Sequence, residues 1–272
     1  MSRPENDRDY VEALARGLAV IESFDAEHPH MTLSEVAQRT GLSRGAVGRI
    51  LHTLVTLGYL SQHDRQFLLE PRALKLGYAY LSSRPLWRLA QPMLEAVARD
   101  VGEACSLSIL DGEEIVYVTS VVATRVVYDF VGVGGRLPAF CASMGRVLLA
   151  AQSDGEIDRF LANATLRART PHTVTDPARL RAIILNARAQ GYATQDEEVE
   201  PGQRAVAVPV TGADGRTIAA INVTVPVHRF TMAAMLEKAV PVLRREAARL
   251  GEALSLVPGP RPVRMLTARG RH

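Results

Sequence analysis

Apolar residues near the start of the chain recur every three or four positions, the spacing of one face of an amphipathic helix. Residues 10–24 show this pattern most clearly. Their apolar positions are Val11, Leu14, Leu18, Ile21 and Phe24. Further along, Thr32 and Glu35 have the spacing of a capping box, in which each side chain accepts a hydrogen bond from the other residue's backbone N–H. This predicts a short helix over about 33–40 that stops at Gly41.

A second short helix and a hairpin are expected next. Ser43 can cap a helix that runs to about Leu57, where Gly58 supplies a left-handed stop. The hydrophobic period then changes from about four to two in residues 59–69, with polar residues 63–65 in the middle. This alternation predicts a small β-hairpin whose tip is 63–65.

Proline marks the end of this first unit. Pro71 begins a further predicted helix over about 71–82, and Pro85 ends it. Three helices followed by a hairpin are typical of a winged helix-turn-helix domain. We therefore assign residues 1–70 to such a domain and 71–84 to a linker helix.

The second half of the chain mixes helical and alternating patterns. Helices are expected over about 86–101, 143–152, 177–190 and 231–253. Strands are expected at 104–110, 113–121, 126–133, 204–210 and 217–225. Asp111-Gly112 and a Gly- and Asp-containing turn join two pairs of strands as hairpins. Residues 85–254 are therefore predicted to form an α+β domain with an antiparallel sheet that senses a small molecule.

Composition narrows the class of protein. The 272 residues are enough for two domains, and a hydrophobic content of 47% excludes wholesale disorder. Residues 255–272 differ, because their prolines and arginines predict a disordered tail. No apolar run approaches the roughly 20 residues that span a bilayer, and the start lacks the apolar segment of a signal peptide. The two cysteines are too few for a disulfide framework, so a cytoplasmic protein is expected.

Charge is unevenly distributed over the predicted first domain. Residues 1–38 hold three arginines against eight acidic residues, whereas residues 39–84 hold seven basic residues against two acidic ones. A surface that faces phosphate beside a solvated acidic face would give this division. A chance imbalance of surface charge is the alternative.

The outer face of the second helix of the predicted pair carries the strongest sign of DNA binding. Its apolar side consists of Val47, Ile50, Leu51 and Leu54. Gly45 and Gly48 lie on the opposite side, although each glycine costs a helix up to about 1 kcal/mol relative to alanine. Small residues there would let the backbone approach the major groove, where Arg44 and Arg49 reach guanine edges or phosphates.

The predicted DNA-contacting set extends beyond this face. Its members are Ser43, Arg44, Gly45, Gly48, Arg49, His52, Thr53 and Arg65. Ser43 and Thr53 are short hydroxyl residues of the kind that contact phosphate. For His52 a base contact and plain solvent exposure remain open. For Arg65 the alternatives are a minor-groove or phosphate contact and a charged turn.

Several long segments resemble the isocitrate lyase regulator (IclR) family of bacterial transcriptional regulators. In the first domain they are RGLAVIESF, TLSEVAQRTGLSRGAVGRILHTLVTLGYL and FLLEPRALKLGYAYLSS; in the second they are GGRLPAFCASMGRVLLA, GYATQDEEVEPGQRAVAVPV and AAINVTV. They cover residues 11–250 in the family's order. RLPAFCASMGRVLLA and INVTV are most similar to the branch that regulates aromatic-acid catabolism through the β-ketoadipate pathway, including regulators of protocatechuate and 4-hydroxybenzoate use.

The resemblance implies a GAF-like effector domain, a homodimer formed through the DNA-binding domains and often a tetramer. It implies double-stranded promoter DNA and a small carboxylate effector as partners, with no membrane partner. Three departures lie where the family's pocket is expected. Ala205 replaces a residue that is often Ser or Cys, Thr224 replaces a usual Ser or Gly, and the QDEE segment that begins at Gln195 replaces VDQE.

Eight residues are expected to bind the effector. They are Arg136, Ser143, Met144, Gln195, Arg204, Ala205, Asn222 and Thr224. The helix that begins at Ser143 offers free N–H groups to a carboxylate, and Ser143 and Met144 match the positions at which family members bind small acids by backbone amides. Arg136 and Arg204 can neutralise a carboxylate, and Asn222 and Thr224 share a strand face that suits ring hydroxyls.

Structural roles remain open for each of these residues. Ser143 can be a helix cap alone, Arg136 or Arg204 can pair with the acidic run 196–198, and polar Asn222 and Thr224 also suit ordinary sheet surface. Four residues can cover an aromatic ring or pack in a core: Tyr128, Phe130, Phe140 and Met144.

Two other functions compete with this interpretation. One is a regulator of the same family that responds to a small aliphatic acid such as glyoxylate or pyruvate. The other is a small-molecule hydrolase that uses the 141–145 turn, although Cys141 stands where a G-x-S-x-G motif needs glycine. A reactive Cys141 is a further alternative to a buried thiol. The histidines and cysteines lack zinc-ligand spacing and 132–135 is no dinucleotide loop, so we expect no enzyme, cofactor or metal.

Overall fold

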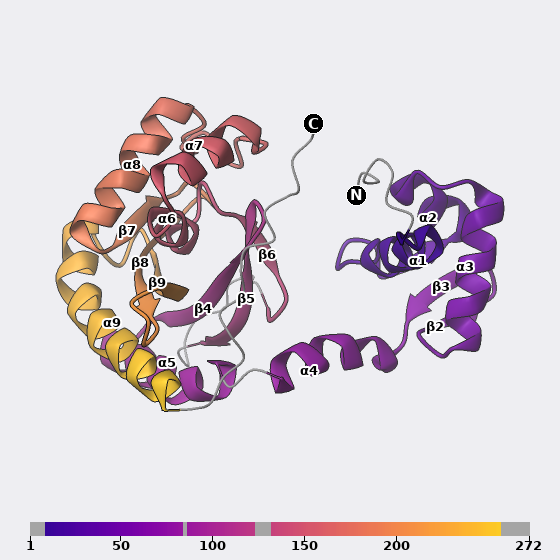
Figure 1. Ribbon diagram of the computed structural model, residues 1–272, viewed down its shortest axis with the longest axis horizontal. Coiled ribbons are helices and arrows are strands. Elements are labelled where there is room, and N and C mark those ends of the chain that lie inside the picture. Colours follow the sequence, from indigo (N-terminus) through magenta and orange to yellow (C-terminus); the bar gives the residue numbers. More distant parts are fainter. Residues whose placement is uncertain (1–8, 84–85, 123–131, 257–272) are drawn as a thin grey trace. The chain divides into compact units, whose positions relative to one another are not determined.

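The computed structural model describes residues 9–83, 86–122 and 132–256 (Figure 1). The chain divides into two compact units, Met1–Tyr80 and Leu81–His272, called here the N-terminal and C-terminal units. In the described part of the chain, no helix has the length and apolar character needed to cross a membrane.

The N-terminal unit is built from three helices and a three-stranded sheet. Its elements are α1 (Glu12–Glu22), β1 (His30–Thr32), α2 (Leu33–Thr40), α3 (Arg44–Thr56), β2 (Leu60–His63) and β3 (Gln66–Leu69). The strand order is β1-β3-β2, with both pairs antiparallel. The capping box of Thr32 and Glu35 is present, and Gly41 and Gly58 have the positive φ that ends each helix. The winged helix-turn-helix prediction is confirmed.

A short 3₁₀ turn, η1 (Pro71–Ala73), precedes α4 (Leu74–Ser82). The sequence predicted one continuous helix over this segment. Pro71 lies at the first position of the turn, where its missing N–H costs nothing. The chain therefore enters the α-helix three residues later than its apolar pattern indicated.

The C-terminal unit contains five helices and six strands in the described residues. They are α5 (Leu86–Val101), β4 (Ala104–Asp111), β5 (Glu114–Val121), β6 (Arg136–Pro138), α6 (Ser143–Ala150), α7 (Asp154–Asn163), α8 (Pro177–Gln190), β7 (Ala193–Asp196), β8 (Gln203–Thr211), β9 (Thr217–Pro226) and α9 (Met232–Ser255). The six strands form one antiparallel sheet in the order β6-β5-β4-β9-β8-β7. The predicted α+β class with an antiparallel sheet is confirmed.

Helices cover both faces of this sheet (Figure 1). On one face, α5 and α9 pack on alternate strand residues such as Leu107, Val206 and Val223. On the other face, α6 lies against the sheet and packs with α7 and α8 in a second core that includes Ile157 and Leu180. The two cores leave the α6 side of β4 and β9 only partly filled, and this is where a pocket opens.

Four described elements were missed by the sequence patterns: β1, β6, β7 and α7. The three strands have only three or four residues each, too few to establish an alternating pattern. Most of the predicted strand 126–133 lies outside the described residues, as does the tail from 257 onward. The described remainder of that range, residues 132 and 133, is not strand.

Candidate functional site

The first candidate site is the outward face of α3. Val47, Leu51 and Leu54 point inward and are buried with residues of α1 and α2. The opposite face exposes Arg44, Gly45, Arg49, His52 and Thr53, and Gly48 is half-buried. The division between the two faces follows from the helical spacing of the apolar residues.

Local hydrogen bonds order this face but leave its arginines available. The Ser43 hydroxyl accepts a hydrogen bond from the Ala46 N–H at 3.3 Å and caps the helix. The Thr53 hydroxyl donates its single proton to the Arg49 carbonyl at 2.9 Å, so in this rotamer its oxygen can only accept from an outside group. Arg44 and Arg49 form no hydrogen bond or ion pair with the described residues. Both guanidinium groups can therefore bind an external anion.

Arg65 lies at the tip of the β2–β3 hairpin. It is exposed, and the preceding residue, Asp64, has a φ of 55° that makes the tight turn possible. Arg72 is placed over the ring of Tyr59 at 5.6 Å and is held at the base of the hairpin. The tip arginine is thus the cation that the hairpin presents to solvent.

The second candidate site is a pocket between α6 and the sheet of the C-terminal unit. Six of the eight predicted effector residues line it: Ser143, Met144, Gln195, Ala205, Asn222 and Thr224. The remaining walls come from residues that the sequence did not single out: Ala104, Ser106, Tyr117, Leu137, Ala142, Val199, Glu200, Gln203, Val225 and Pro226. The sequence could have indicated Ser106, because side chains alternate between the two faces of β4 and Ser106 lies on the same face as Ala104.

The N-terminus of α6 meets this pocket without a side-chain cap. The N-cap residue is Ala142, which has no side-chain acceptor. No side chain of the N-cap residue therefore binds the first N–H groups of the helix, which carry the positive end of the helix dipole. The Ser143 side chain is 2% exposed, and its hydroxyl oxygen has no hydrogen-bond partner among the described residues. A buried hydroxyl without a partner is costly, so this position favours a polar group in the pocket.

Close packing fixes the position of this helix end. A Cβ atom at Gly145 would lie 2.2 Å from the carbonyl oxygen of Ala139. Only glycine allows the first turn of α6 to approach the 139–142 turn so closely. Met144 is also fixed, because its sulfur accepts a hydrogen bond from the Ser108 hydroxyl of β4 at 3.2 Å.

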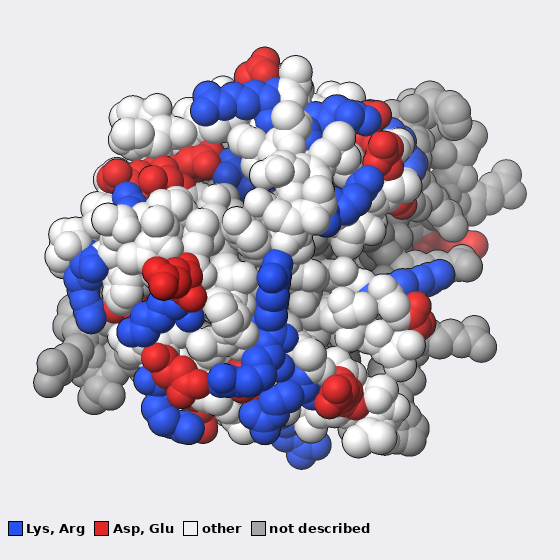
Figure 2. Space-filling view, turned by 90° about the vertical axis from the view of Figure 1, so that its left-hand side faces the viewer, with Lys and Arg blue, Asp and Glu red and all other residues white. Residues whose placement is uncertain are grey.

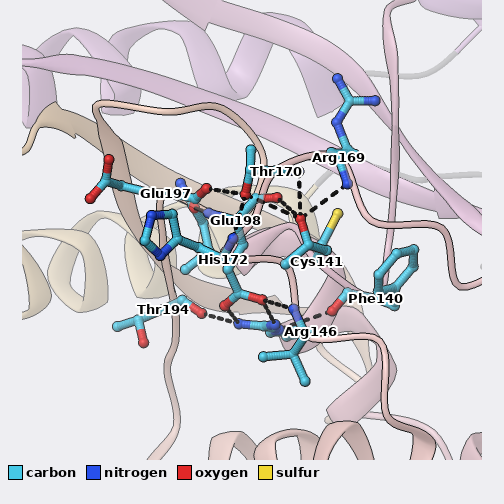
Figure 3. Close-up of polar contacts among 12 residues, drawn as sticks. Phe140, Cys141, Arg146, Arg169, Thr170, His172, Thr194, Glu197 and Glu198 are labelled. Carbon is cyan, nitrogen blue, oxygen red and sulfur yellow. Dashed lines mark hydrogen bonds and ion pairs between the residues drawn. The ribbon is translucent and has the colours of Figure 1, made fainter.

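One turn into α6, Arg146 lies among Phe140, Thr194 and Glu198 (Figure 3). The guanidinium donates to both carboxylate oxygens of Glu198 at 2.7 and 2.6 Å, and to the carbonyl oxygens of Phe140 and Thr194 at 2.9 and 2.8 Å. Arg146 is 2% exposed. The sequence analysis missed this pair, although an arginine inside the apolar run 144–150 was a signal for a buried ion pair.

Glu197 and Glu198 are held by further hydrogen bonds (Figure 3). The hydroxyls of Thr170 and Thr173 donate to the carbonyls of Glu197 and Glu198 at 2.6 and 2.7 Å. The side-chain amide oxygen of Gln195 (Oε1) accepts from the Glu198 backbone N–H at 3.0 Å. Val199 and Glu200, which line the pocket, follow directly in the chain, so these bonds set the position of that wall.

Two predicted effector residues lie elsewhere. Arg136 is exposed and donates to Asp111 and Glu114 at 2.7 and 2.6 Å. Arg204 points away from the pocket and binds Asp196 at 2.9 Å and the Phe230 carbonyl at 2.8 Å. Both arginines therefore form an ion pair with a nearby carboxylate, the structural alternative to binding the effector. For Arg136, however, the partners come from the β4–β5 hairpin and not from the acidic run 196–198.

Of the aromatic residues near this site, one lines the pocket and another belongs to the core. Tyr117 lines the pocket, and burial raises the pKa of its hydroxyl to about 12, so it is neutral at physiological pH. Phe140 is 1% exposed and belongs to the core around α6. Tyr128 and Phe130 lie outside the described residues.

Burial also raises the pKa of Cys141 to about 11, which keeps its thiol protonated.

The helical side of the C-terminal unit has a mixed surface charge. Figure 2, viewed from the side of α8 and α9, shows Lys and Arg interleaved with Asp and Glu. Arg181 and Arg188 pair with Asp158 and Asp154 at 2.7 and 2.6 Å. Such pairing cancels the local field, so this face does not form a positive patch for phosphate.

Two family models match the chain. Residues 13–64 match the IclR helix-turn-helix domain, and residues 78–251 match the bacterial transcriptional regulator IclR C-terminal domain. Together they cover most of both units.

Named relatives and a solved structure agree with these matches. The chain is 43% identical to the Pca regulon regulatory protein of Pseudomonas putida, over 87% of this chain and 82% of that one. It is 35% identical to the p-hydroxybenzoate hydroxylase transcriptional activator of Acinetobacter baylyi, over 89% and 91%. An IclR homolog from Microbacterium hydrocarbonoxydans complexed with 4-hydroxybenzoate has a TM-score of 0.75 and 28% identity, over 89% of this chain and 98% of that one.

Proposed function

The chain belongs to the IclR family of bacterial transcriptional regulators, and from this premise we propose that its C-terminal pocket binds a small aromatic carboxylate that controls operator binding by α3. It acts as a regulator of aromatic-acid catabolism and performs no chemical step on the ligand. This proposal rests on the Ser143 hydroxyl, which is buried beside the start of α6 and has no hydrogen-bond partner in the described part of the chain.

A carboxylate suits this end of the pocket. The free N–H groups at the start of α6 donate to its oxygens, and the helix dipole favours the negative charge. The Ser143 hydroxyl donates a further hydrogen bond. Arg136 and Arg204 take no part, because each is already paired outside the pocket.

An aromatic ring suits the rest of the pocket. Leu137, Met144, Val199 and Tyr117 supply apolar surface, while Asn222 and Thr224 supply polar groups farther along the sheet. An apolar body with a few placed polar groups is typical of a small-molecule site. A structural neighbour in complex with 4-hydroxybenzoate and a relative named as a p-hydroxybenzoate hydroxylase activator support a hydroxybenzoate-type effector here.

DNA binding is assigned to the N-terminal unit. Arg44 and Arg49 reach base edges or phosphates in the major groove, and Gly45 and Gly48 let the helix approach closely. Ser43, His52 and Thr53 extend the contact along α3, and Arg65 at the hairpin tip contacts the adjacent backbone or minor groove.

The regulator pairs with a second copy through the N-terminal unit. The apolar side chains that face solvent include Val11 just before α1, Leu14 and Leu18 on α1, and Leu74, Leu76 and Tyr78 on α4. Exposed apolar side chains on two helices suit a symmetric interface, and a dimer or dimer of dimers reads a two-fold symmetric operator. Light scattering on the wild type and on Leu14→Glu tests this. A dimer or tetramer that dissociates in the variant supports the pairing, and an unchanged mass in the variant contradicts it.

Two alternatives have less support. A hydrolase that uses the 141–145 turn needs a base beside Ser143, and its hydroxyl has no hydrogen-bond partner in the part of the chain that the structure describes. An aliphatic acid such as pyruvate can use the same helix N-terminus, but it leaves the apolar walls unfilled.

Calorimetry of the full chain tests the proposal. The ligand panel is benzoate, 3- and 4-hydroxybenzoate, protocatechuate, glyoxylate and pyruvate, each added with and without promoter DNA. Binding of at least one aromatic acid with a change in DNA affinity supports the proposal. Binding of the aliphatic acids alone overturns the aromatic assignment, and binding of none overturns the pocket.

A further inference from the structure

Two serines face each other on the pocket side of β4 and β5. Ser106 is 3% exposed and lines the pocket. Ser120 is its direct partner across the two strands, and the Ser120 hydroxyl donates to the Ser106 hydroxyl at 3.1 Å. A change in the contacts of Ser106 therefore reaches Ser120 through one hydrogen bond.

An irregularity in β5 turns the preceding side chain toward the other face of the sheet. The pairing register of β4 with β5 shifts once, so that Val118 has no partner residue on β4. Val118 packs in the core that contains α5 and α9, and the next residue, Thr119, also points to α5. Successive residues of a regular strand point to opposite faces, and a bulge breaks that alternation. Thr119 and Ser120 are therefore neighbours in the chain that face the helix side and the pocket side of the sheet.

On the helix side, Thr119 is hydrogen-bonded to α5. Its hydroxyl donates to the side-chain oxygen of Gln91 at 2.9 Å, and the Gln91 amide nitrogen donates to the Glu95 carboxylate at 3.1 Å. In the part of the chain that the structure describes, this is the one hydrogen bond that joins α5 to the sheet; the rest of the contact is apolar and includes Leu94 and Val97. Apolar packing is non-directional. The Thr119–Gln91 bond therefore fixes which residues of α5 stand opposite β5.

The same side of α5 is hydrogen-bonded to the end of the linker helix. Trp87 precedes Gln91 by one helical turn, and its indole N–H donates to the Leu81 carbonyl in the last turn of α4 at 2.7 Å. Hydrogen bonds and neighbouring residues therefore run without a break from Ser106 in the pocket lining to Leu81 in the linker helix. Along the chain, α4 follows the DNA-binding elements.

From this series of contacts we propose that the hydrogen bond between Thr119 and Gln91 couples the effector pocket to the linker helix, so that effector binding changes DNA affinity through it. The inference rests on the proposed function, because it needs an effector whose binding alters DNA affinity. Coupling of this kind requires two arrangements of α5 on the sheet, of which the effector favours one. Thr119 and Gln91 neither line the pocket nor belong to α3. Loss of their bond should therefore separate the two binding events without removing either.

DNA affinity with and without the acid tests the proposal in the full chain. Gel-shift titrations on promoter DNA are run with and without saturating benzoate, 3- or 4-hydroxybenzoate or protocatechuate, and calorimetry gives the affinity for each acid without DNA. In the wild type, at least one acid should change the DNA dissociation constant about fivefold or more, the lower end of allosteric effects. Thr119→Val, which keeps the shape and removes the hydroxyl, should reduce that change to within about twofold. It should still bind the acid and the promoter separately.

Three further variants distinguish lost coupling from damage to the fold. Gln91→Met removes the acceptor from the helix side and should also lose the response. Thr119→Ser keeps the hydroxyl and should keep the response. Gln190→Met removes a half-buried glutamine that donates to the Tyr192 carbonyl beside α8, outside this series of contacts, and should keep it as well. Urea unfolding followed by the fluorescence of Trp87, the single tryptophan, checks that each variant is folded.

The outcomes are distinct. A response to the acid that is lost in Thr119→Val and Gln91→Met, with acid binding retained, and kept in the other two variants supports the inference. If the wild type responds but the folded variants show any other pattern, the inference is wrong while the proposed function stands. If the wild type binds none of these acids, or binds them without a change in DNA affinity, the proposed function fails and the inference fails with it.

Discussion

Arg146 and Glu198 form a bidentate ion pair between the first turns of α6 and the segment that walls the pocket, with N–O distances of 2.7 and 2.6 Å. Neither side chain reaches the pocket surface. The pair connects the helix end at which we propose that the carboxylate binds with Val199 and Glu200, which also line the pocket. The distance between these two walls therefore depends on a contact that the ligand does not touch.

Replacing Arg146 with methionine should destabilise the C-terminal unit by about 3–5 kcal/mol, because it leaves the Glu198 carboxylate buried without its partner. Urea unfolding followed by Trp87 fluorescence measures this. The double variant Arg146→Met/Glu198→Leu should be more stable than the single one. Arg181→Ala, which breaks an exposed pair of similar length on α8, should cost less than about 1 kcal/mol. Equal losses in Arg146→Met and Arg181→Ala would contradict this account.

Gly145→Ala should destabilise the same unit by about 1–3 kcal/mol and weaken ligand binding, because the added methyl group would meet the Ala139 backbone. Gly155→Ala on α7 is the matched control, since nothing lies within 4 Å of its added Cβ. We expect that control to leave stability unchanged or slightly raised. Thermal unfolding and calorimetry measure the two effects. A Gly145 variant with wild-type stability and affinity would show that α6 can move away from the turn.

Both cysteines should be unreactive in the folded protein at pH 8. Burial raises the pKa of Cys141 to about 11 and also raises that of Cys105, so the nucleophilic thiolate is scarce at pH 8. Ellman's reagent should detect almost no thiol in the native chain and two per chain in denaturant. As pH rises toward 11, Cys141 should begin to react before Cys105. Rapid reaction of one thiol at pH 8 would instead favour a reactive Cys141.

Most helices could be predicted because their ends are encoded locally. Thr32 with Glu35, Ser43 and Asp176 form side-chain caps in the structure, and Gly191 adopts the positive φ of a helix stop. The capping box of Ser153 that begins α7 was equally local and was overlooked. The short strands β1, β6 and β7 could not be predicted, because tertiary pairing defines them.

The pocket was predictable only in part, for a similar reason. Ser143 and Met144 were found from a helix start, and Asn222 and Thr224 from strand alternation, both of which are local patterns. Whether an arginine enters the pocket depends on which carboxylates the fold brings near it. The β4–β5 hairpin places Asp111 and Glu114 beside Arg136, and sequence spacing alone did not reveal this.

Arg49→Ala should weaken binding to promoter DNA by about 1–3 kcal/mol, because Arg49 lies on the exposed face of α3 and pairs with none of the described residues. Gel-shift titrations on the promoter and on random DNA measure the loss. A larger loss on the promoter identifies a base contact, and an equal loss on both identifies a phosphate contact. Arg16→Ala on α1, which already pairs with Glu12, should leave both affinities unchanged. No loss for Arg49→Ala would remove this residue from the interface.

The last prediction concerns Ser143, whose replacement by alanine should change stability and ligand affinity in opposite directions. In the free protein the Ser143 hydroxyl is buried, and none of the residues that the structure describes forms a hydrogen bond with it. Its removal therefore relieves an unsatisfied polar group, and the free energy of unfolding should stay the same or rise by up to about 1–3 kcal/mol.

In the complex that we propose, the same hydroxyl donates to the effector carboxylate, so Ser143→Ala should weaken binding of a hydroxybenzoate by about 1.5–3 kcal/mol, the range for hydrogen bonds to charged groups. The backbone N–H groups of α6 remain, so binding weakens without being abolished. Calorimetry gives the affinity, and urea unfolding without ligand gives the stability. Ser153→Ala, which removes a serine cap outside the pocket, should do the reverse, lowering stability by about 0.5–2 kcal/mol and leaving affinity intact. A Ser143 variant that loses stability but not affinity would mean that the hydroxyl serves the fold, and the carboxylate must then bind elsewhere.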